Sequence, residues 1–320
     1  MFKGLFKFFI DLIMICVAIV LIFSARGVYG KFFPNEKDKQ RLTQTTTNTN
    51  SNNNNSNNNA TENKKVENTN KTKLTKEQLD SKFYELMTKY KNEKNEVSFV
   101  YDNLKTGYRY AYNDNKVYTA ASTTKVIYAL YYYDLVRDGK IKLDTPIKYN
   151  KSNFEDGNGK ITNDVDKKES YPLTDVLQNM LTYSDNTATK MLTNNYKNIK
   201  NIRENVYKKI GISSAEKNSD DNLVTPQAME KVWLYLYKNK DKYQDMFKFL
   251  KEGETYSTGS IEDKEIASKY GAIGNFNHEN AIVFGNEDYL VIIFTNNMAH
   301  AKDTINKMFK DIDDITENRN

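Results

Sequence analysis

The chain has 320 residues, of which 28% are charged and 38% hydrophobic, and its formal net charge is +5. Basic and acidic residues are interleaved, and this modest excess of positive charge does not indicate a nucleic-acid partner. One cysteine and two histidines offer no disulfide, no cysteine metal site and too few ligands for a usual zinc set. We therefore expect no metal, no cofactor and no nucleic-acid partner.

The first predicted element is an apolar helix near the N-terminus. Residues 8–25 are almost wholly apolar, with Asp11 as the one charge, and are close to the shortest stretch, about 18 residues, that spans a bilayer. Two lysines precede this stretch and favour a cytoplasmic N-terminus. A cleaved signal peptide is the alternative, but Arg26 follows directly and leaves no clean cleavage site. We expect residues 1–33 to be an uncleaved, single-pass anchor in the cell membrane.

Residues 34–74 are predicted to be a disordered linker. Asparagine, threonine and lysine dominate this stretch, and the run 52–59 is asparagine except for Ser56. Almost nothing here can be buried, so no packing would offset the entropy that ordering costs. A polar tether of this kind would hold a following domain away from the membrane surface.

Residues 75–316 are predicted to form one folded domain. A capping box starts a helix at Thr75, and the apolar residues of this helix share one face. Two strand patterns follow, 96–102 and 108–113, with a turn between them that is typical of a hairpin. The next helix begins at Ser122, and an Asp-Gly pair ends it.

The middle of the domain is helical in pattern, and its end returns to strands. Helical spacing recurs in residues 173–183, 187–192, 199–210 and 226–237. Strand patterns follow at 265–273, 280–284 and 289–296, before a last helix at 301–315. Because strands lie at both ends of the domain, we expect an antiparallel sheet that pairs those ends, with a helical subdomain inserted between them.

Three short motifs carry the candidate chemistry, in the order Ser122-Thr123-Thr124-Lys125, Ser184-Asp185-Asn186 and Lys269-Tyr270-Gly271. If Ser122 begins a helix, Lys125 falls one turn later on the same face, within reach of the serine oxygen. A serine becomes a nucleophile when a neighbouring base takes its proton, and an amine can be that base if burial or nearby cations lower its pKa. The second motif adds a hydroxyl and an amide. The third adds a cation and a glycine, where backbone can approach a ligand closely.

These motifs resemble the S-x-x-K, S-D-N and K-T-G motifs of the penicillin-recognising serine hydrolases, and most closely those of the class A β-lactamases. The resemblance covers roughly residues 75–316. It implies an α+β fold of the β-lactamase/transpeptidase type: a five-stranded antiparallel sheet flanked by helices, with an inserted all-α lobe. The active site would lie in the groove between the sheet and the lobe, and the predicted transmembrane helix would precede this domain.

The resemblance also implies four catalytic residues. Ser122 would be the nucleophile, Lys125 the base or part of a proton relay, and Ser184 would pass a proton to the leaving nitrogen. The backbone N–H groups of Ser122 and Ala272 would form the oxyanion hole. The ordinary alternatives are a helix-capping serine, a solvated lysine and a polar turn.

Four further residues would bind substrate. By the same resemblance, Asn186 would hold Lys125 and the substrate's amide, and Lys269 would attract the substrate's carboxylate and lower the pKa of Lys125. Gly271 would let the strand backbone come close to the ligand. Tyr270 departs from the family, which has serine or threonine at this position to bind that carboxylate, so carboxylate recognition is in question.

A second departure concerns the glutamate that activates water in class A enzymes. In that family a long Ω-loop presents Glu-x-x-Leu-Asn, whereas residues 212–224 are short and contain no such motif. Glu216, Asp220 and Asp221 are the nearby carboxylates, and a solvated acidic turn is the simpler interpretation of them. Because general-base help is worth ~10²–10⁴-fold, an ester on Ser122 would form and then hydrolyse slowly without it.

Three functions remain open. The first is a membrane-anchored, extracytoplasmic serine hydrolase of the class A type, acylated at Ser122 by a β-lactam or a related amide. The second is a cell-wall peptidase that acts on peptidoglycan stem peptides, which the short Ω-loop favours. The third is a non-hydrolytic module that binds penicillin or cell-wall peptide. Each predicts a small-molecule or stem-peptide partner, attachment to the membrane through the N-terminal helix, and a monomeric catalytic domain.

Overall fold

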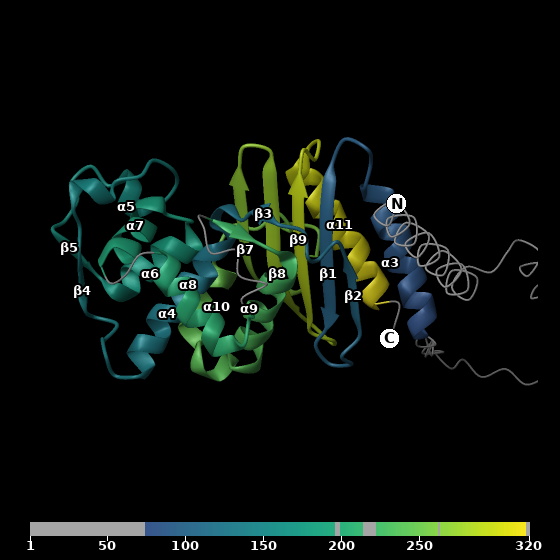
Figure 1. Cartoon of the computed structure of the whole chain (residues 1–320), viewed down its shortest axis with the longest axis horizontal. Helices are drawn as coiled ribbons and strands as arrows, with labels where there is room; N and C mark the ends of the chain where they lie inside the picture. The colour runs from purple at the N-terminus through teal and green to yellow at the C-terminus, as the bar shows by residue number, and fades with distance from the viewer. Residues whose placement is uncertain (1–73, 196–198, 214–221, 262, 318–320) are drawn as a thin grey trace, which may run out of the picture. The chain divides into compact units, whose positions relative to one another are not determined.

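The computed structural model of the chain describes residues 74–195, 199–213, 222–261 and 263–317 (Figure 1). The predicted anchor, residues 1–33, and all but the last residue of the predicted linker lie outside these ranges. Within them, no helix combines the length and the apolar character that crossing a membrane requires.

A five-stranded antiparallel sheet, in the order β2-β1-β9-β8-β7, organises the domain (Figure 1). Its strands are β1 (Glu96–Asn103), β2 (Arg109–Tyr112), β7 (Glu265–Ile273), β8 (Phe276–Phe284) and β9 (Tyr289–Asn296). β1 pairs with β9 along its whole length, from Glu96 opposite Asn296 to Asn103 opposite Tyr289. The prediction that the two ends of the domain share one sheet is confirmed.

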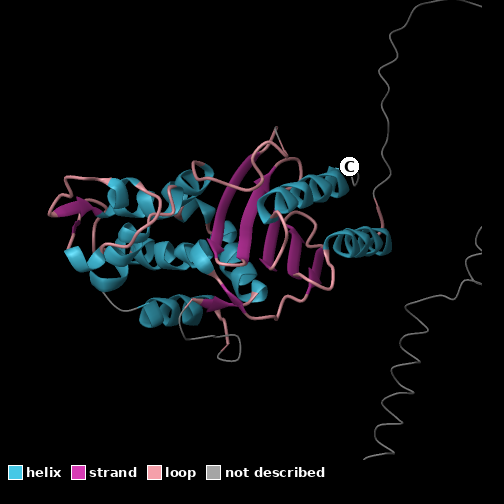
Figure 2. Ribbon diagram, turned by 90° about the horizontal axis from the view of Figure 1, so that it is seen from above, coloured by secondary structure: helices cyan, strands magenta, loops and turns pink. Residues whose placement is uncertain are grey.

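Two helices cover one face of this sheet, α3 (Lys76–Tyr90) and α11 (Ala301–Glu317), as Figure 2 shows from above. The predicted capping box starts α3: Gln78 N–H donates to Thr75 Oγ1, and Thr75 N–H donates to the Gln78 side chain. Phe83 of α3 packs against β1, with ring centroids 5.8 Å from Phe99 and 4.6 Å from Tyr101. This layer contains no candidate site residue, and its packing stabilises the sheet on one face.

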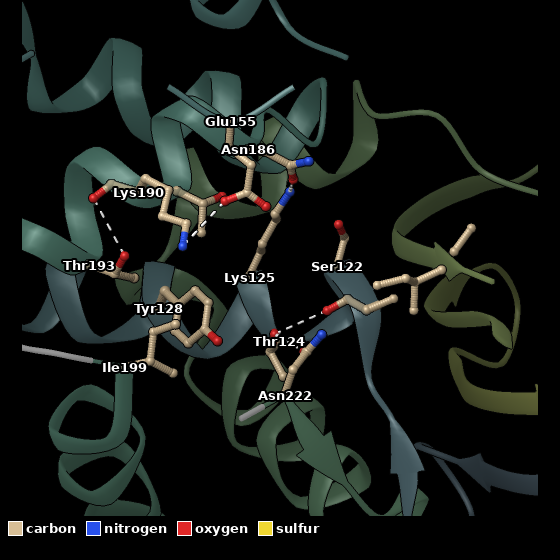
Figure 3. Close-up of a pocket in the computed structure, with 14 residues that line it drawn as sticks. Ser122, Thr124, Lys125, Tyr128, Glu155, Asn186, Lys190, Thr193, Ile199 and Asn222 are labelled. Atoms are coloured by element: carbon tan, nitrogen blue, oxygen red, sulfur yellow. Dashed lines mark hydrogen bonds and ion pairs between the residues drawn. The ribbon is translucent and has the colours of Figure 1, made fainter. Parts of the chain in front are cut away.

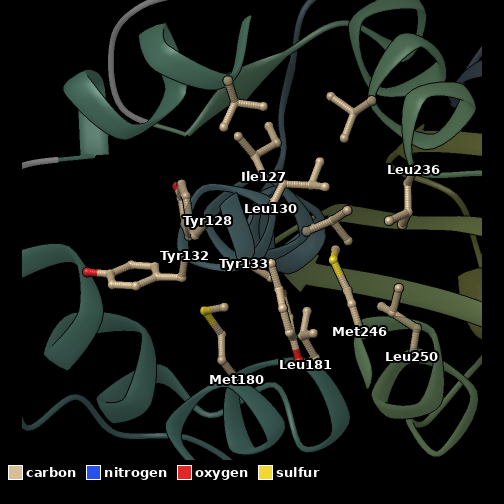
Figure 4. Close-up of a cluster of buried hydrophobic side chains, with 14 of the residues drawn as sticks. Ile127, Tyr128, Leu130, Tyr132, Tyr133, Met180, Leu181, Leu236, Met246 and Leu250 are labelled. Atoms are coloured by element: carbon tan, nitrogen blue, oxygen red, sulfur yellow. The ribbon is translucent and has the colours of Figure 1, made fainter. Parts of the chain in front are cut away.

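The inserted helices form the predicted lobe on the other side of the sheet, where α9 (Pro226–Lys238) and α10 (Gln244–Lys251) pack on its face (Figure 1). The other inserted helices are α4 (Lys125–Arg137), α5 (Lys160–Asn163), α6 (Leu173–Thr182), α7 (Asn186–Asn195) and α8 (Ile199–Ile210). Helix α4 lies at the centre, and its Ile127, Leu130 and Tyr133 are buried among side chains of α6, α9 and α10 (Figure 4). A helix buried on nearly all sides explains why its sequence is apolar almost throughout.

Several short elements were not predicted from the sequence. Two-stranded sheets form from β3 (Tyr118–Thr119) with β6 (Leu223–Val224), and from β4 (Pro146–Lys148) with β5 (Ser170–Pro172). Short 3-10 turns lie at η1 (Ala121–Thr124), η2 (Lys151–Asn153) and η4 (Lys240–Lys242). Strands of two or three residues are too short to show an alternating pattern, so periodicity cannot reveal them.

Candidate active site

Ser122 lies in η1, the 3-10 turn that leads into α4, and not at the first position of the α-helix as the sequence predicted. The turn is held by Ala120, whose carbonyl accepts from Thr123 Oγ1 at 2.7 Å and whose N–H donates to Asn222 O at 2.6 Å. The Ser122 side chain is partly exposed, and its hydroxyl forms no hydrogen bond with another residue of the described ranges. The α4 N-terminus is therefore directed at a serine that remains accessible.

Gly271 brings β7 against this turn. A Cβ atom at position 271 would lie 2.8 Å from Ser122 N and 2.9 Å from Ala120 O, closer than real Cβ contacts allow. Only glycine fits, and its absence of a side chain puts the following residue, Ala272, beside Ser122 in the wall of one cavity. This is the arrangement that a two-donor oxyanion hole needs.

Lys125 is buried, with 4% of its surface exposed, one turn after Ser122. Its Nζ donates to Ser184 O at 2.6 Å, to Ser184 Oγ at 3.2 Å and to Asn186 Oδ1 at 2.8 Å. No hydrogen bond joins Lys125 Nζ to Ser122 Oγ. Burial lowers the pKa of Lys125 well below the usual 10.5, and the nearby charge of Lys269 lowers it further. The lowered pKa favours the neutral form of the amine, which can accept a proton. The hydrogen bonds of Lys125 tie this amine to Ser184 and Asn186 of the second motif.

The second motif is fixed by its buried aspartate. Asp185 accepts hydrogen bonds from Ile161 N at 2.9 Å, from the Thr162 hydroxyl at 2.7 Å and from Ala188 N at 2.9 Å. These bonds start α7 and hold the preceding Ser184 in a left-handed backbone conformation, at a φ of 56°. Asn186 Nδ2 also donates to Asp156 O at 3.0 Å, so the amide that meets Lys125 has a fixed orientation.

Lys269 is buried behind the cavity, with 1% of its surface exposed. Its Nζ donates to Tyr270 O at 3.2 Å and lies 4.5 Å from the centre of the Tyr270 ring. Burial lowers the pKa of Lys269 to about 7, although the carboxylates of Glu279 and Glu254 oppose this shift. Lys269 does not line the cavity, and its effect there is through its charge.

Tyr270 does not line the cavity either. Its hydroxyl donates to Glu254 Oε2 at 3.2 Å, and its ring lies 5.2 Å from that of Tyr256. The phenol is therefore engaged at the edge of the sheet, in contacts that a small serine or threonine side chain could not reach.

The cavity has a volume of about 220 Å³ and lies where β7, η1 and α4 meet α7 (Figure 3). Four of the eight predicted site residues line it: Ser122, Lys125, Asn186 and Ala272. It is also lined by residues outside the motifs, among them Tyr128, Glu155, Thr189, Lys190, Thr193, Ile199 and Asn222. Nothing in their local sequence marks them, because they meet only through the packing of the lobe.

Within the described ranges, no group of acidic, histidine or cysteine side chains could hold a metal ion.

The model of the beta-lactamase enzyme family matches residues 78–316. The chain belongs to this family. The match spans every element from α3 to α11, and so includes the sheet, the lobe and all three motifs. No curated protein matches the chain significantly.

Solved structures of this β-lactamase type share the fold at low identity. The structure of PBP-A is 16% identical, with a TM-score of 0.66 over 74% of this chain and 96% of that chain. The β-lactamase from Sphaerobacter thermophilus is 17% identical, with a TM-score of 0.66 over 74% of this chain and 97% of that chain. The TLA-1 extended spectrum β-lactamase is also 17% identical, with a TM-score of 0.66 over 74% and 99%. These likenesses support the β-lactamase/transpeptidase-like α+β fold, including the five-stranded sheet.

Proposed function

We propose that the chain is a membrane-anchored, extracytoplasmic serine hydrolase that is acylated at Ser122 by β-lactams or related amides. The observation that carries this proposal is the buried amine of Lys125, which shares a cavity with the accessible hydroxyl of Ser122. Among the described residues, no carboxylate lies within hydrogen-bonding distance of the Lys125 amine, and burying its charge without such a partner is costly. A lowered pKa that supplies a base for a nearby hydroxyl accounts for this burial.

The proposed acylation step uses these groups in turn. Lys125, in its neutral form, takes the proton of Ser122 as the oxygen attacks the carbonyl carbon of the amide. The negative charge that develops on the carbonyl oxygen is stabilised by the N–H groups of Ser122 and Ala272. Lys125 passes the proton to Ser184 Oγ, 3.2 Å away, and Ser184 delivers its own proton to the leaving nitrogen. The C–N bond breaks and an ester remains on Ser122.

The acylation of one relative by penicillin G supports this proposal. A mutant of PBP-A, 17% identical with a TM-score of 0.65 over 75% of this chain and 96% of that chain, was solved as an acyl-enzyme complex with penicillin G. A stem-peptide peptidase is the second candidate function, since residues 212–224 are short and contain no Glu-x-x-Leu-Asn motif.

A chromogenic cephalosporin combined with intact-mass spectrometry tests the proposal. The wild-type chain should gain the mass of one acyl group, whereas Ser122→Ala should gain none, because the alanine has no oxygen to form the ester. Steady colour development would indicate a β-lactamase, and a lasting adduct with cleavage of stem peptides would indicate the peptidase. Labelling that persists in Ser122→Ala would remove Ser122 from the role of nucleophile. A wild-type chain with neither adduct nor peptide cleavage would leave only a binding module.

A further inference from the structure

A carboxylate that no motif indicated reaches the same cavity as Ser122. Glu155 lies just after η2, in the loop that leads to α5, and its side chain lines the cavity (Figure 3). Among the described residues that line this cavity, it is the one acidic side chain. Its Oε2 lies 3.4 Å from Nζ of Lys190, a residue of α7 that lines the cavity as well.

The backbone of Glu155 is fixed to the helix that carries the second motif. Its N–H donates to Thr187 Oγ1 at 3.2 Å, and its carbonyl accepts from the same hydroxyl at 3.1 Å. Thr187 is fully buried and follows Asn186, the residue that meets the Lys125 amine. Glu155 is therefore held in a defined position relative to Lys125, and its negative charge acts on that amine, opposing the fall of its pKa.

Stability does not account for this carboxylate. The side chains of Glu155 and Lys190 are 47% and 46% exposed, and ion pairs of this exposure contribute about 0–1 kcal/mol. The same exposure suits a group that must meet water. The ion pair with Lys190 joins the carboxylate to α7, and both side chains line the cavity.

We propose that Glu155 is the general base that activates water to hydrolyse the ester on Ser122. This inference rests on the proposed acylation of Ser122 and adds the group that ends the reaction. A water molecule attacks the ester carbonyl while Glu155 takes one of its protons, and the N–H groups of Ser122 and Ala272 stabilise the resulting oxyanion. The ester C–O bond then breaks. The proton returns through the Lys125 amine to Ser122 Oγ, and the acid product leaves.

The variant Glu155→Gln in the full-length chain separates acylation from hydrolysis. Glutamine keeps the shape and removes the basic oxygen, so the acyl-enzyme formed with a penicillin should accumulate and decay ~10²–10⁴-fold more slowly than in the wild type. Acylation should not slow with it, because Lys125 and Ser122 are retained and loss of the Glu155 charge favours the neutral form of the Lys125 amine. Asp156→Asn is the matched control: it makes the same change in charge one residue later, at a side chain outside the cavity, and decay should remain normal.

Hydroxylamine distinguishes a base from a structural support. This strong nucleophile attacks an ester without help from a base, so it should release the acyl group from Glu155→Gln about as fast as from the wild type. Slow release by both water and hydroxylamine would show a distorted site and overturn the proposal, as would a Glu155→Gln variant that hydrolyses at the normal rate. A wild-type adduct that never decays would also overturn it and leave acylation intact. A wild type that forms no adduct would refute the proposed function itself.

Discussion

Two buried lysines determine the electrostatics of the candidate site. Burial is the largest cause of the lowered pKa for both Lys125 and Lys269. The unfolded state holds the proton of a lysine up to about pH 10.5, whereas folded Lys269 releases it at about 7, so its contribution to stability rises with pH between about 7 and 10.5. Near neutral pH this lysine therefore lowers the stability of the fold, which is the pattern expected of a functional group.

Gly271→Ala is expected to reduce acylation of Ser122. The new Cβ would lie 2.8 Å from Ser122 N, 2.9 Å from Ala120 O and 3.0 Å from Thr123 N, and all three are backbone atoms that cannot rotate away. Separation of β7 from η1 would disturb the oxyanion hole, and a displacement of this size costs on the order of 10²-fold in rate. Overpacking should also lower the free energy of unfolding by about 1–3 kcal/mol. Stopped-flow acylation with urea unfolding measures both.

Gly253→Ala is the control for this experiment. A Cβ there would lie 3.4 Å from its nearest neighbour, Thr182 O, which is an ordinary contact, so acylation should persist. If Gly271→Ala folds normally and is acylated at the wild-type rate, the close packing of β7 on η1 would be contradicted.

At the scale of elements, His278 joins the sheet to the turn that carries Ser122. Its Nδ1 accepts from Thr295 N at 3.1 Å, so the proton lies on Nε2, which donates to Thr119 O at 2.7 Å. The ring is fully buried, 4.2 Å from the Phe294 ring and 5.7 Å from that of Tyr118. One side chain of β8 thus fixes β3 immediately before η1.

Acid should weaken this connection. Burial lowers the pKa of His278 to about 4 from 6.5, so between these values the unfolded state binds a proton that the folded state does not. Stability is therefore lost as pH falls from about 6.5 to 4, by on the order of 3 kcal/mol. Urea unfolding at pH 7 and pH 4 should show a larger loss for the wild type than for His278→Gln.

The comparison with His278→Gln is needed because titration of the neighbouring Glu279 changes the stability of the fold in the opposite direction. Burial raises the pKa of Glu279 to about 7, so this carboxyl contributes stability as pH falls from about 7 to 4.5. Both proteins contain Glu279, and its effect cancels in the difference. Equal losses in the wild type and His278→Gln would refute the role of the histidine.

Local pattern predicted the long elements well and the turn at Ser122 less well. The capping box at Thr75 and the apolar runs of β9 and α4 were correctly identified, because each pattern lies within one element. The η1 turn depends instead on Asn222, about 100 residues later in the chain, which accepts from Ala120 N. A contact of that sequence separation leaves no periodic signal, so the α-helix was predicted to begin three residues too early.

For the whole molecule, the order of strands and helices was sufficient to predict the architecture. Strands at both ends and helices between them allow few other ways to bury both faces of a sheet. The candidate site was predicted only where short motifs mark it. Glu155 lies 32 residues before Thr187 in sequence and is brought to Lys190 by hydrogen bonds to that buried threonine. Such side-chain contacts depend on the finished packing and have no counterpart in spacing or composition.

The location of the molecule is a prediction that rests on sequence alone. If residues 1–33 are an uncleaved anchor, the full-length chain should sediment with membranes and resist extraction by high salt, because apolar burial in lipid does not depend on ionic strength. A chain that lacks residues 1–68, and so keeps every described element, should be soluble and still acylate at Ser122. Fractionation followed by gel detection of a labelled penicillin measures both. An intact mass that lacks the N-terminal segment in a soluble wild-type protein would instead indicate a cleaved signal peptide.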